Sequence, residues 1–213
     1  MSKELRLYFI RHGETQYNIE KRMQGFCDSP LTDNGIIQAR SVGAGLADIP
    51  FVAAYASDSQ RVLDTARYAI GARNIAVTKD PRLKEMNFGI LEAMLQEDIV
   101  AKHGNILETF FSLADVDSKI EEGESYPELL LRKSAAVKDI IEAHQDTGGN
   151  ILIFSHGVTI GYYMRSLINK PEFPMHDNCC VSVVLVKDGQ LLVEKVADAS
   201  FKETGKNLLS LNQ

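Results

Sequence analysis

Residues 5–15, LRLYFIRHGET, join a short apolar run to an arginine, a histidine and a glycine, and residues 151–157, ILIFSHG, repeat that arrangement late in the chain. Short apolar runs bounded by glycine and charged residues are typical of buried strands in a mostly parallel sheet. Each His-Gly then lies at the carboxyl end of its strand, where open α/β sheets bind their ligands. If the two strands are neighbours, His12 and His156 face one another across a crevice.

Arg11 adds to this pair of histidines a positive charge that titration does not remove. Two imidazoles and a guanidinium suit a phosphoryl group, whose oxygens need several donors and a compensating charge. The alternative is two unrelated histidines that happen to lie beside glycines at strand ends. The presence of Arg11 beside one of them favours the phosphoryl site.

The chain has 213 residues, of which 45% are hydrophobic, so it can form one sizeable core without disulfides or metals. We therefore expect a single domain over residues 1–213. The net charge of −6 argues against a nucleic-acid partner, because such binding needs a basic surface to neutralise phosphates. Any anion site must therefore be local.

The cysteine count and the hydropathy pattern bear on the compartment. Three cysteines are an odd number, and adjacent residues such as Cys179 and Cys180 rarely bridge each other, so a reducing compartment is the simplest expectation. The chain enters its first strand without the apolar region of a signal peptide, and no stretch approaches the roughly 18 apolar residues of a membrane span. We expect a cytoplasmic protein with no membrane partner.

Strand and helix patterns alternate along the chain and predict an α/β fold. Strands are expected at 5–10, 51–56, 75–78 and 150–154, helices at 32–48, 60–72, 126–144 and 158–168, and a hairpin at 181–186 and 191–196. Two or three helical pieces fill 91–113, and an acidic surface stretch follows at 115–124. This order predicts a three-layer α/β/α sandwich whose mostly parallel sheet has an antiparallel edge.

Residues 7–40, LYFIRHGETQYNIEKRMQGFCDSPLTDNGIIQAR, closely resemble the histidine phosphatase superfamily, in the branch that contains cofactor-dependent phosphoglycerate mutases and small bacterial phosphatases. Further landmarks follow in the family's order: ASDSQRVLDTA at 56–66, LKEMNFGILE at 83–92, GES at 123–125 and FSHG at 154–157. The region 93–122 carries none. Ala93 stands where the family usually has glycine, which puts the local backbone in doubt. The resemblance implies a phosphoglycerate mutase-like fold.

The resemblance implies that His12 attacks phosphorus and becomes a phosphohistidine, which requires a neutral imidazole nitrogen in line with the leaving oxygen. Charge then spreads over three phosphoryl oxygens, and the donors that we expect to meet it are Arg11, Arg61 and His156. Arg61 falls in the first turn of a helix, where a cation is unfavourable unless an anion binds the same helix end. Otherwise it is a surface arginine paired with Asp64 or Asp58.

The remaining members of the predicted substrate-binding set lie in the loops that follow the strands. Asn18 resembles the family's neutral phosphate contact. Arg22 and Gln24 are expected to border the same pocket. The alternatives are that Arg22 is a solvated arginine and that Gln24 is an amide that stabilises the loop. The set is Asn18, Arg22, Gln24, Gly25 and Gly157.

Glu85 is the candidate general acid and base, because an alkoxide leaves poorly near neutral pH unless something protonates it. It lies in KEMNFG between Lys84 and Met86, and the alternative is an exposed glutamate in a loop. Glu14 is a weaker candidate, which we interpret as a structural hydrogen-bond partner.

Other titratable residues are given lesser roles. His176 could reach the pocket rim, His103 and His144 are expected on the surface, and Cys27 is expected to be inert packing. The sequence has no DxD, HExxH or clustered Cys/His set, so we expect no metal and no other cofactor, with the arginines supplying the charge.

These residues predict a metal-independent phosphatase acting on a small phosphorylated metabolite. A cofactor-dependent phosphoglycerate mutase is the first alternative, since it shares the site but re-delivers the phosphoryl group, and a catalytically weak phospho-ligand binding or regulatory protein is the second. The absence of tryptophan and the loop sequence QGFCDSPLT resemble the phosphatases. The segment 93–124 is expected to be a lid-like insertion. The sequence leaves open whether the protein forms a homodimer.

Overall fold

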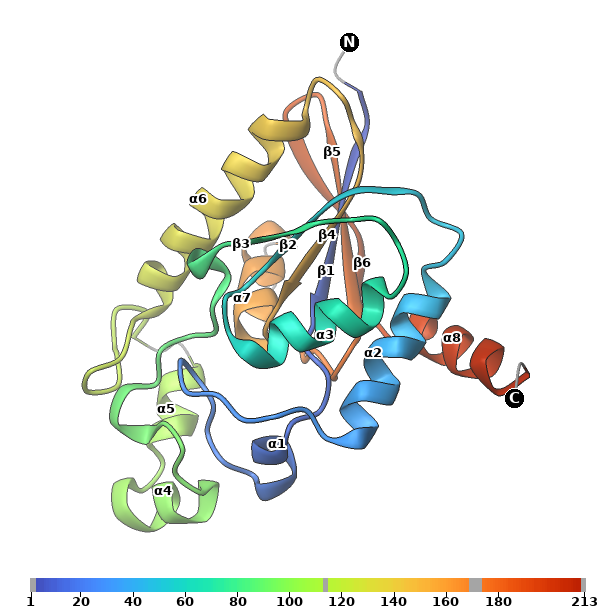
Figure 1. Cartoon of the computed structure of the whole chain (residues 1–213). Helices are drawn as coiled ribbons and strands as arrows, with labels where there is room; N and C mark the ends of the chain where they lie inside the picture. Colours follow the sequence, from blue (N-terminus) through green and yellow to red (C-terminus); the bar gives the residue numbers. More distant parts are fainter. Residues whose placement is uncertain (1–2, 113–114, 169–173, 212–213) are drawn as a thin grey trace.

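The computed structural model describes residues 3–112, 115–168 and 174–211, which form a six-stranded sheet in the order β3-β2-β4-β1-β5-β6 (Figure 1). The strands are β1 (Leu5–Arg11), β2 (Phe51–Ala56), β3 (Val77–Lys79), β4 (Gly149–Ser155), β5 (Val181–Lys187) and β6 (Gln190–Asp198). β1 pairs in parallel with β4, β4 with β2, and β2 with β3, whereas β5 runs antiparallel to β1 and to β6. The predicted hairpin therefore forms one edge of the sheet, and the predicted fold class is confirmed.

Helices cover both faces of this sheet. They are α1 (Gln16–Glu20), α2 (Asp33–Gly45), α3 (Gln60–Ile70), η1 (Pro81–Leu83), η2 (Gly89–Leu91), α4 (Gln96–His103), α5 (Ile106–Ser112), α6 (Tyr126–His144), α7 (Gly157–Ile168) and α8 (Ser200–Leu211). Two of the main helices begin at side-chain caps that the sequence places there, Thr32 before α2 and Ser125 before α6. None of the helices in the described ranges has the length and apolar character needed to cross a membrane.

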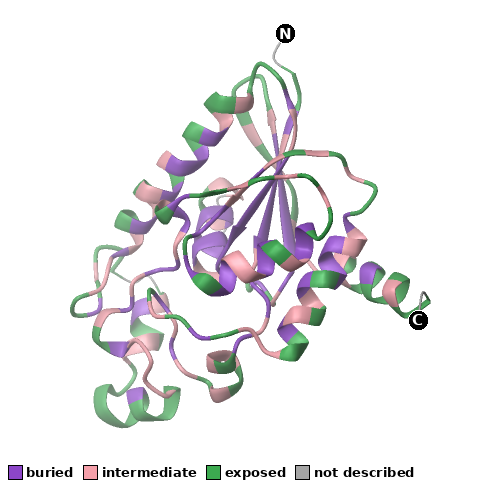
Figure 2. Cartoon of the chain, in the orientation of Figure 1, coloured by how far each residue is buried: buried purple, intermediate pink, exposed green. Residues whose placement is uncertain are grey.

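The alternation of side chains along β1 separates two cores. Tyr8 and Ile10 face the cluster that contains α2 and α3, while Leu7 and Phe9 face the cluster that contains α6 and α7. Both faces are therefore buried, as the purple strands of Figure 2 show. A strand buried on both faces has the continuous apolar character that residues 7–10 show.

Helix α8 is an element that the sequence analysis did not predict. It packs very closely against α2. A Cβ atom added to Gly45 would lie 1.8 Å from the carbonyl oxygen of Phe201, and one added to Gly205 would lie 1.8 Å from the carbonyl oxygen of Ser41. Two glycines thus allow the helix backbones to meet. The short helix α1, between the predicted strand 5–10 and the predicted helix 32–48, was also not predicted.

A third apolar cluster lies beyond the sheet and contains much of the segment 93–124. Phe110 and Phe111 of α5 both pack against Phe88, with ring centroids 6.3 and 5.9 Å away. In Figure 1, α4 and α5 lie below the sheet, at the end where β1 and β4 terminate. This position suits a cover over the strand ends, and its movement as a lid stays a prediction.

Lys133 of α6 is fully buried among apolar residues of the core. Its ammonium lies 4.9 Å from the ring centroid of Phe9 and 6.0 Å from that of Tyr163, and it has no hydrogen-bond partner among the described residues. Burial lowers the pKa of Lys133 to about 7. The unfolded chain therefore binds the Lys133 proton more tightly than the folded protein does. Below pH 7 the buried ammonium lowers the free energy of unfolding by its full cost, and this cost disappears as the pH rises from 7 toward 10.5.

Lys133→Met should therefore stabilise the protein, by on the order of 3 kcal/mol at pH 7 and by less at pH 9.5. Urea unfolding at the two pH values measures both differences. Lys138→Met is the matched control, since Lys138 on the same helix is exposed and should change stability by less than about 0.5 kcal/mol. An equal gain at both pH values would contradict a titrating, buried Lys133.

Candidate active site

The carboxyl ends of β1 and β4 lie side by side, as the sequence predicts. Arg11 is opposite Ser155 in the parallel pairing, and the backbone N–H of His12 donates to the Ser155 carbonyl at 3.1 Å. The rings of His12 and His156 have centroids 5.4 Å apart and cross at 69°, and both are almost completely buried. The two histidines therefore share one site at the end of the sheet.

The ring of His12 is held in a defined tautomer. Its Nδ1 lies 2.8 Å from the carbonyl oxygen of Gly13, which can only accept, so Nδ1 carries the hydrogen and donates it. Burial and the charges of Arg61 and Arg11 lower the pKa of His12 well below its usual value. His12 is therefore neutral, and Nε2 carries the free lone pair that a nucleophile requires.

His156 is oriented by partners on both ring nitrogens. Nδ1 accepts from Nη2 of Arg61 at 3.0 Å, because a guanidinium can only donate, and Nε2 therefore donates to Oγ of Ser57 at 2.9 Å. Burial and the Arg61 charge lower the pKa of His156 well below its usual value. Its predicted donation to a phosphoryl group would redirect the Nε2 hydrogen from Ser57, and that role stays a prediction.

Arg61 is 1% exposed and is not a surface residue. Its Nη1 donates to the carbonyl of Cys27 at 2.7 Å and to the Asp28 carboxylate at 2.9 Å, and its Nη2 donates to the carbonyl of Gly25 at 2.9 Å. The loop 25–28 therefore wraps the guanidinium and fixes its direction.

The alternative of a surface arginine paired with Asp64 or Asp58 is wrong. Asp64 pairs with Arg67 and Asp58 with Lys84. The anion at the start of α3 belongs to the protein: Asp28 accepts from the backbone N–H of Gln60 at 2.5 Å and of Arg61 at 3.4 Å. An aspartate distant in sequence thus fulfils the helix-end role that we attributed to a bound ligand.

Arg11 completes the cationic side of the site. Its Nη1 donates to the carbonyl of His176 at 2.5 Å, while the ring of His176 is buried and bonded to Ser182 at 2.7 Å, so His176 acts here through its backbone. The Nε atoms of Arg11 and Arg61 are both buried and have no hydrogen-bond partner among the described residues. Such a donor costs about 1–3 kcal/mol. Both charges act on His12, so they would stabilise an oxyanion that binds beside that ring.

Glu85 is only 6% exposed, and its carboxylate contacts the first turn of α7. The alternative of an exposed loop glutamate is therefore wrong. Its Oε1 accepts from the backbone N–H groups of Met86 at 3.0 Å and Thr159 at 2.8 Å, and from the Thr159 hydroxyl at 2.8 Å. Its Oε2 accepts from the N–H of Val158 at 3.1 Å. The carboxyl group is thereby held against the backbone of Val158, which follows His156 by two residues. Its charge also acts on the guanidinium of Arg11.

Glu14 makes a structural contact. Its Oε1 accepts from the hydroxyl of Thr32 at 2.7 Å, and its backbone N–H donates to the side chain of Gln38 at 2.9 Å. These bonds join the loop after β1 to the start of α2, in agreement with a structural interpretation of Glu14.

Asn18 and Gln24 stabilise the same loop. Asn18 and Thr15 form a reciprocal cap of α1, with the Thr15 N–H 3.1 Å from the Asn18 side-chain oxygen. Gln24 donates to the Thr15 hydroxyl at 2.9 Å and accepts from Ser29 at 3.1 Å. The structure thus gives Gln24 the loop-stabilising contacts, and phosphate contact by Asn18 stays a prediction.

Arg22 reaches toward the segment beyond residue 92. It donates to Glu20 at 2.6 Å and to the carbonyl of Ala93 at 2.9 Å. Ala93 has a φ of 63°, so the residue that departs from the family's glycine does adopt the left-handed conformation. A non-glycine residue there costs about 1–2 kcal/mol, and the Arg22 contact helps to hold that carbonyl.

The two predicted glycines lie at close approaches. A Cβ atom on Gly25 would come within 2.1 Å of the Glu92 carboxylate, and one on Gly157 within 3.1 Å of Nε of Arg11. Both glycines thus let charged side chains approach the backbone.

Several residues around the site were not predicted. Asn178 donates to the carbonyl of His12 at 3.0 Å, and the hydroxyl of Thr65 accepts from the N–H of Gly13 at 2.9 Å. Asn178 lies outside the quoted motifs, whereas Asp28, Ser57 and Thr65 lie inside them and could have been singled out. The unpredicted contacts come from Asp28, Ser57, Thr65, Glu92, Glu124, Arg132 and Asn178.

The lesser candidates lie outside the site. His103 is exposed, and His144 is half-buried with its Nε2 2.9 Å from the Tyr55 hydroxyl, so only His103 is a plain surface residue. Burial raises the pKa of the Cys27 thiol, which suits packing rather than nucleophilic chemistry. Within the described ranges, no three His, Cys, Asp or Glu side chains are grouped as metal ligands.

Comparisons with known proteins agree with this geometry. The sequence profile of the histidine phosphatase superfamily (branch 1) matches residues 7–199. The probable phosphoglycerate mutase GpmB of Escherichia fergusonii is 32% identical over 205 residues, covering 92% of this chain and 94% of that protein. Its counterpart in Enterobacter sp. (strain 638) is 34% identical over 182 residues, covering 84% and 83%.

Solved structures show the same fold. The phosphoglycerate mutase from Bacillus anthracis has a TM-score of 0.86 at 30% identity, covering 96% of this chain and 98% of its own. YhfR of Bacillus stearothermophilus has a TM-score of 0.87 at 31% identity, covering 93% and 99%. The alpha-ribazole phosphatase from Shigella flexneri has a TM-score of 0.78 at 27% identity, covering 91% and 96%. This chain is a member of branch 1 of the histidine phosphatase superfamily.

Proposed function

We propose that this protein is a metal-independent phosphatase that hydrolyses small phosphomonoesters through a phosphohistidine on His12. The observation that supports this most directly is the neutral His12, whose tautomer leaves Nε2 for attack and on which the charges of Arg11 and Arg61 both act. The Nε atoms of these two arginines are buried and lack partners among the described residues. A dianionic phosphoryl group satisfies those donors and receives the attack of Nε2.

In the first step Nε2 of His12 forms a bond to phosphorus while the bond from phosphorus to the ester oxygen breaks. Glu85 gives a proton to that oxygen, so that an alcohol leaves. Oε1 of Glu85 accepts from two backbone N–H groups and lies 2.8 Å from the Thr159 hydroxyl, whose single hydrogen is shared with the Lys84 carbonyl. Oε2 accepts from one N–H group, which makes Oε2 the less occupied oxygen and the one able to carry the proton. In the second step water attacks phosphorus, Glu85 takes its proton, and the nitrogen–phosphorus bond breaks to release phosphate.

A phosphoglycerate mutase is the second candidate, favoured by the names of the relatives in Escherichia fergusonii and Bacillus anthracis. The neighbour from Shigella flexneri is named a phosphatase. The absence of tryptophan and the loop QGFCDSPLT favour hydrolysis here. A binding protein with weak chemistry is disfavoured by the intact set of His12, Glu85 and the two arginines.

The deciding assay follows two products from the same purified protein. With a panel of phosphometabolites and excess EDTA, we expect phosphate release to persist, because Arg11 and Arg61 supply the charge that Mg²⁺ would otherwise bring. With 3-phosphoglycerate and 2,3-bisphosphoglycerate, we expect phosphate rather than 2-phosphoglycerate. Activity abolished by EDTA and restored by Mg²⁺ would refute metal independence. Predominant isomerisation would establish the mutase, and no turnover would favour the binding protein.

A further inference from the structure

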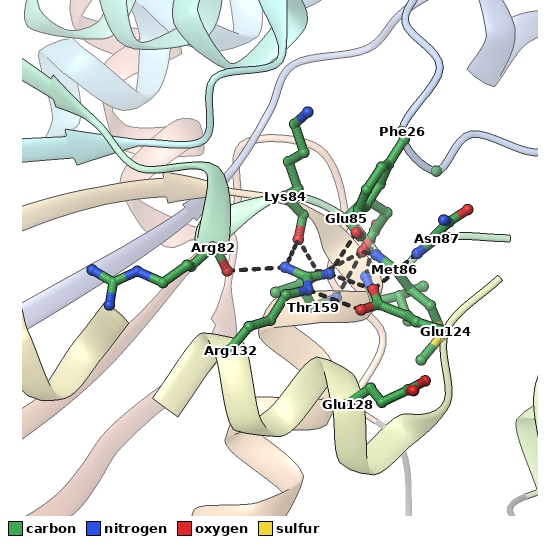
Figure 3. A network of polar contacts seen from close by, with 12 residues as sticks. Phe26, Arg82, Lys84, Glu85, Met86, Asn87, Glu124, Glu128, Arg132 and Thr159 are labelled. Atoms are coloured by element: carbon green, nitrogen blue, oxygen red, sulfur yellow. Dashed lines mark hydrogen bonds and ion pairs between the residues drawn. The ribbon is translucent and has the colours of Figure 1, made fainter. Parts of the chain in front are cut away.

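The guanidinium of Arg132, on α6, donates hydrogen bonds to the chain segment that carries Glu85 (Figure 3). Nη1 donates to the carbonyls of Arg82 at 2.9 Å and Lys84 at 2.8 Å, and Nη2 donates to the carbonyl of Glu85 at 2.7 Å. The same guanidinium pairs with Glu124 at 2.5 and 2.9 Å. The side chains of Arg132 and Glu124 are only 18% and 14% exposed.

Glu124 holds the other side of Glu85. Its Oε1 accepts from the N–H of Asn87 at 2.9 Å, and its own N–H donates to the carbonyl of Asn87 at 3.0 Å. Residues 84–88 have no regular secondary structure, so no helix or ladder bonds fix this stretch. The N–H groups of Val158 and Thr159 hold the Glu85 carboxyl. The backbone position from which it reaches them depends on side chains that bind the backbone before and after it.

The other end of the segment 93–124 is anchored to a different part of the site. The carboxylate of Glu92 accepts from the N–H groups of Phe26 at 2.8 Å and Cys27 at 2.7 Å. The carbonyls of Gly25 and Cys27 hold Arg61. Oε1 of Glu92 also accepts from the N–H of Phe88 at 3.1 Å, three residues after Glu85. Glu92 thus binds the loop that holds Arg61 and also the far end of the stretch 84–88, whereas the hydrogen bonds of Glu124 and Arg132 go to the backbone on both sides of Glu85.

We propose that Arg132 and Glu124 are positioning residues that set the carboxyl of Glu85 for proton transfer, and that Glu92, at the opposite end of the same segment, sets Arg61 for the phosphoryl group. The inference rests on the proposed roles of Glu85 and Arg61. It means that the residues at the two ends of the stretch 92–124 act mainly on different parts of one reaction. In the phosphorylation step, a displaced Glu85 weakens the protonation of the leaving oxygen, while Nε2 of His12 and the arginines keep their places.

The experiment compares single-turnover phosphorylation with glycerol 3-phosphate, whose alkoxide must be protonated, and with p-nitrophenyl phosphate, whose phenolate leaves without a proton. Arg132→Met and Glu124→Gln should lower the rate on glycerol 3-phosphate about 10-fold to 100-fold and the rate on p-nitrophenyl phosphate less than about threefold. Arg132→Lys should not rescue, since an ammonium cannot bind three carbonyls and a carboxylate in one plane. Glu92→Gln should lower both rates, because the loop that holds Arg61 acts on the phosphoryl group of either substrate.

Two kinds of reference keep the outcomes distinct. Lys119→Met breaks an exposed ion pair with Glu128 at the same end of α6 and should change neither rate. Glu85→Gln and Arg61→Ala test the proposed function itself. If Glu85→Gln shows no dependence on the leaving group, the acid assignment fails. If Glu85→Gln shows it and the Arg132 and Glu124 variants lose both substrates equally, the positioning inference is overturned. Thermal melts identify any variant that does not fold, and Glu124→Gln, the smaller change, then decides.

Discussion

His12→Ala is expected to lower phosphate release to less than about a hundredth of the wild-type rate, because the variant has no nitrogen to receive the phosphoryl group. The remaining donors can still bind a phosphomonoester, so substrate affinity should fall much less than turnover. In the wild-type protein, a brief quench with labelled substrate should trap label on His12 that is stable to base and labile to acid, as a phosphoramidate is.

His103→Ala serves as the matched control, since this exposed histidine of α4 lies in the segment that covers the strand ends. It should keep both the rate and the label. Turnover of His12→Ala above about a hundredth of wild type would assign the nucleophile to another residue. Label that survives acid but not base would point to an acyl phosphate instead of a phosphohistidine.

Glu85→Gln should lose on the order of 10²-fold or more on alkyl phosphates and much less on p-nitrophenyl phosphate. The amide oxygen of glutamine can still accept from the N–H groups of Met86 and Thr159, while its NH₂ group no longer accepts from Val158. The contrast between the two substrates therefore reports on the proton, and the size of either loss alone does not. Arg61→Ala should lose similar factors on both substrates, because the guanidinium stabilises the transferred group and not the departing oxygen.

The comparison belongs to the phosphorylation step, measured by burst or single-turnover kinetics, because Glu85 is also the base for dephosphorylation and would mask the difference in steady-state kcat. Equal losses for Glu85→Gln on the two substrates would remove it from the acid role. Glu14 would be the next residue to test, although its bond to Thr32 makes it part of the loop structure.

Much of the fold was predictable because strands and helices leave local patterns. The continuous apolar character of residues 7–10 and 151–154 reflects burial on both faces of a parallel sheet, and Thr32 and Ser125 are strong caps. Helix α8 was not predictable in the same way. Its stability comes from close contact with α2 across Gly45 and Gly205, and such a contact has no local signature.

By itself, the sequence determined the fold class, the family and the presence of His12 and His156 at adjacent strand ends, because these follow from periodicity and from short motifs whose residues are neighbours in the chain. Tertiary structure alone decided which anion faces the start of α3, which nitrogen of each histidine is free, and what holds Glu85. Asp28, Ser57 and the pair Arg132 and Glu124 reach those positions from distant segments. Hydrogen bonds between such segments depend on where the folded backbone brings their atoms together, and local propensity does not encode that.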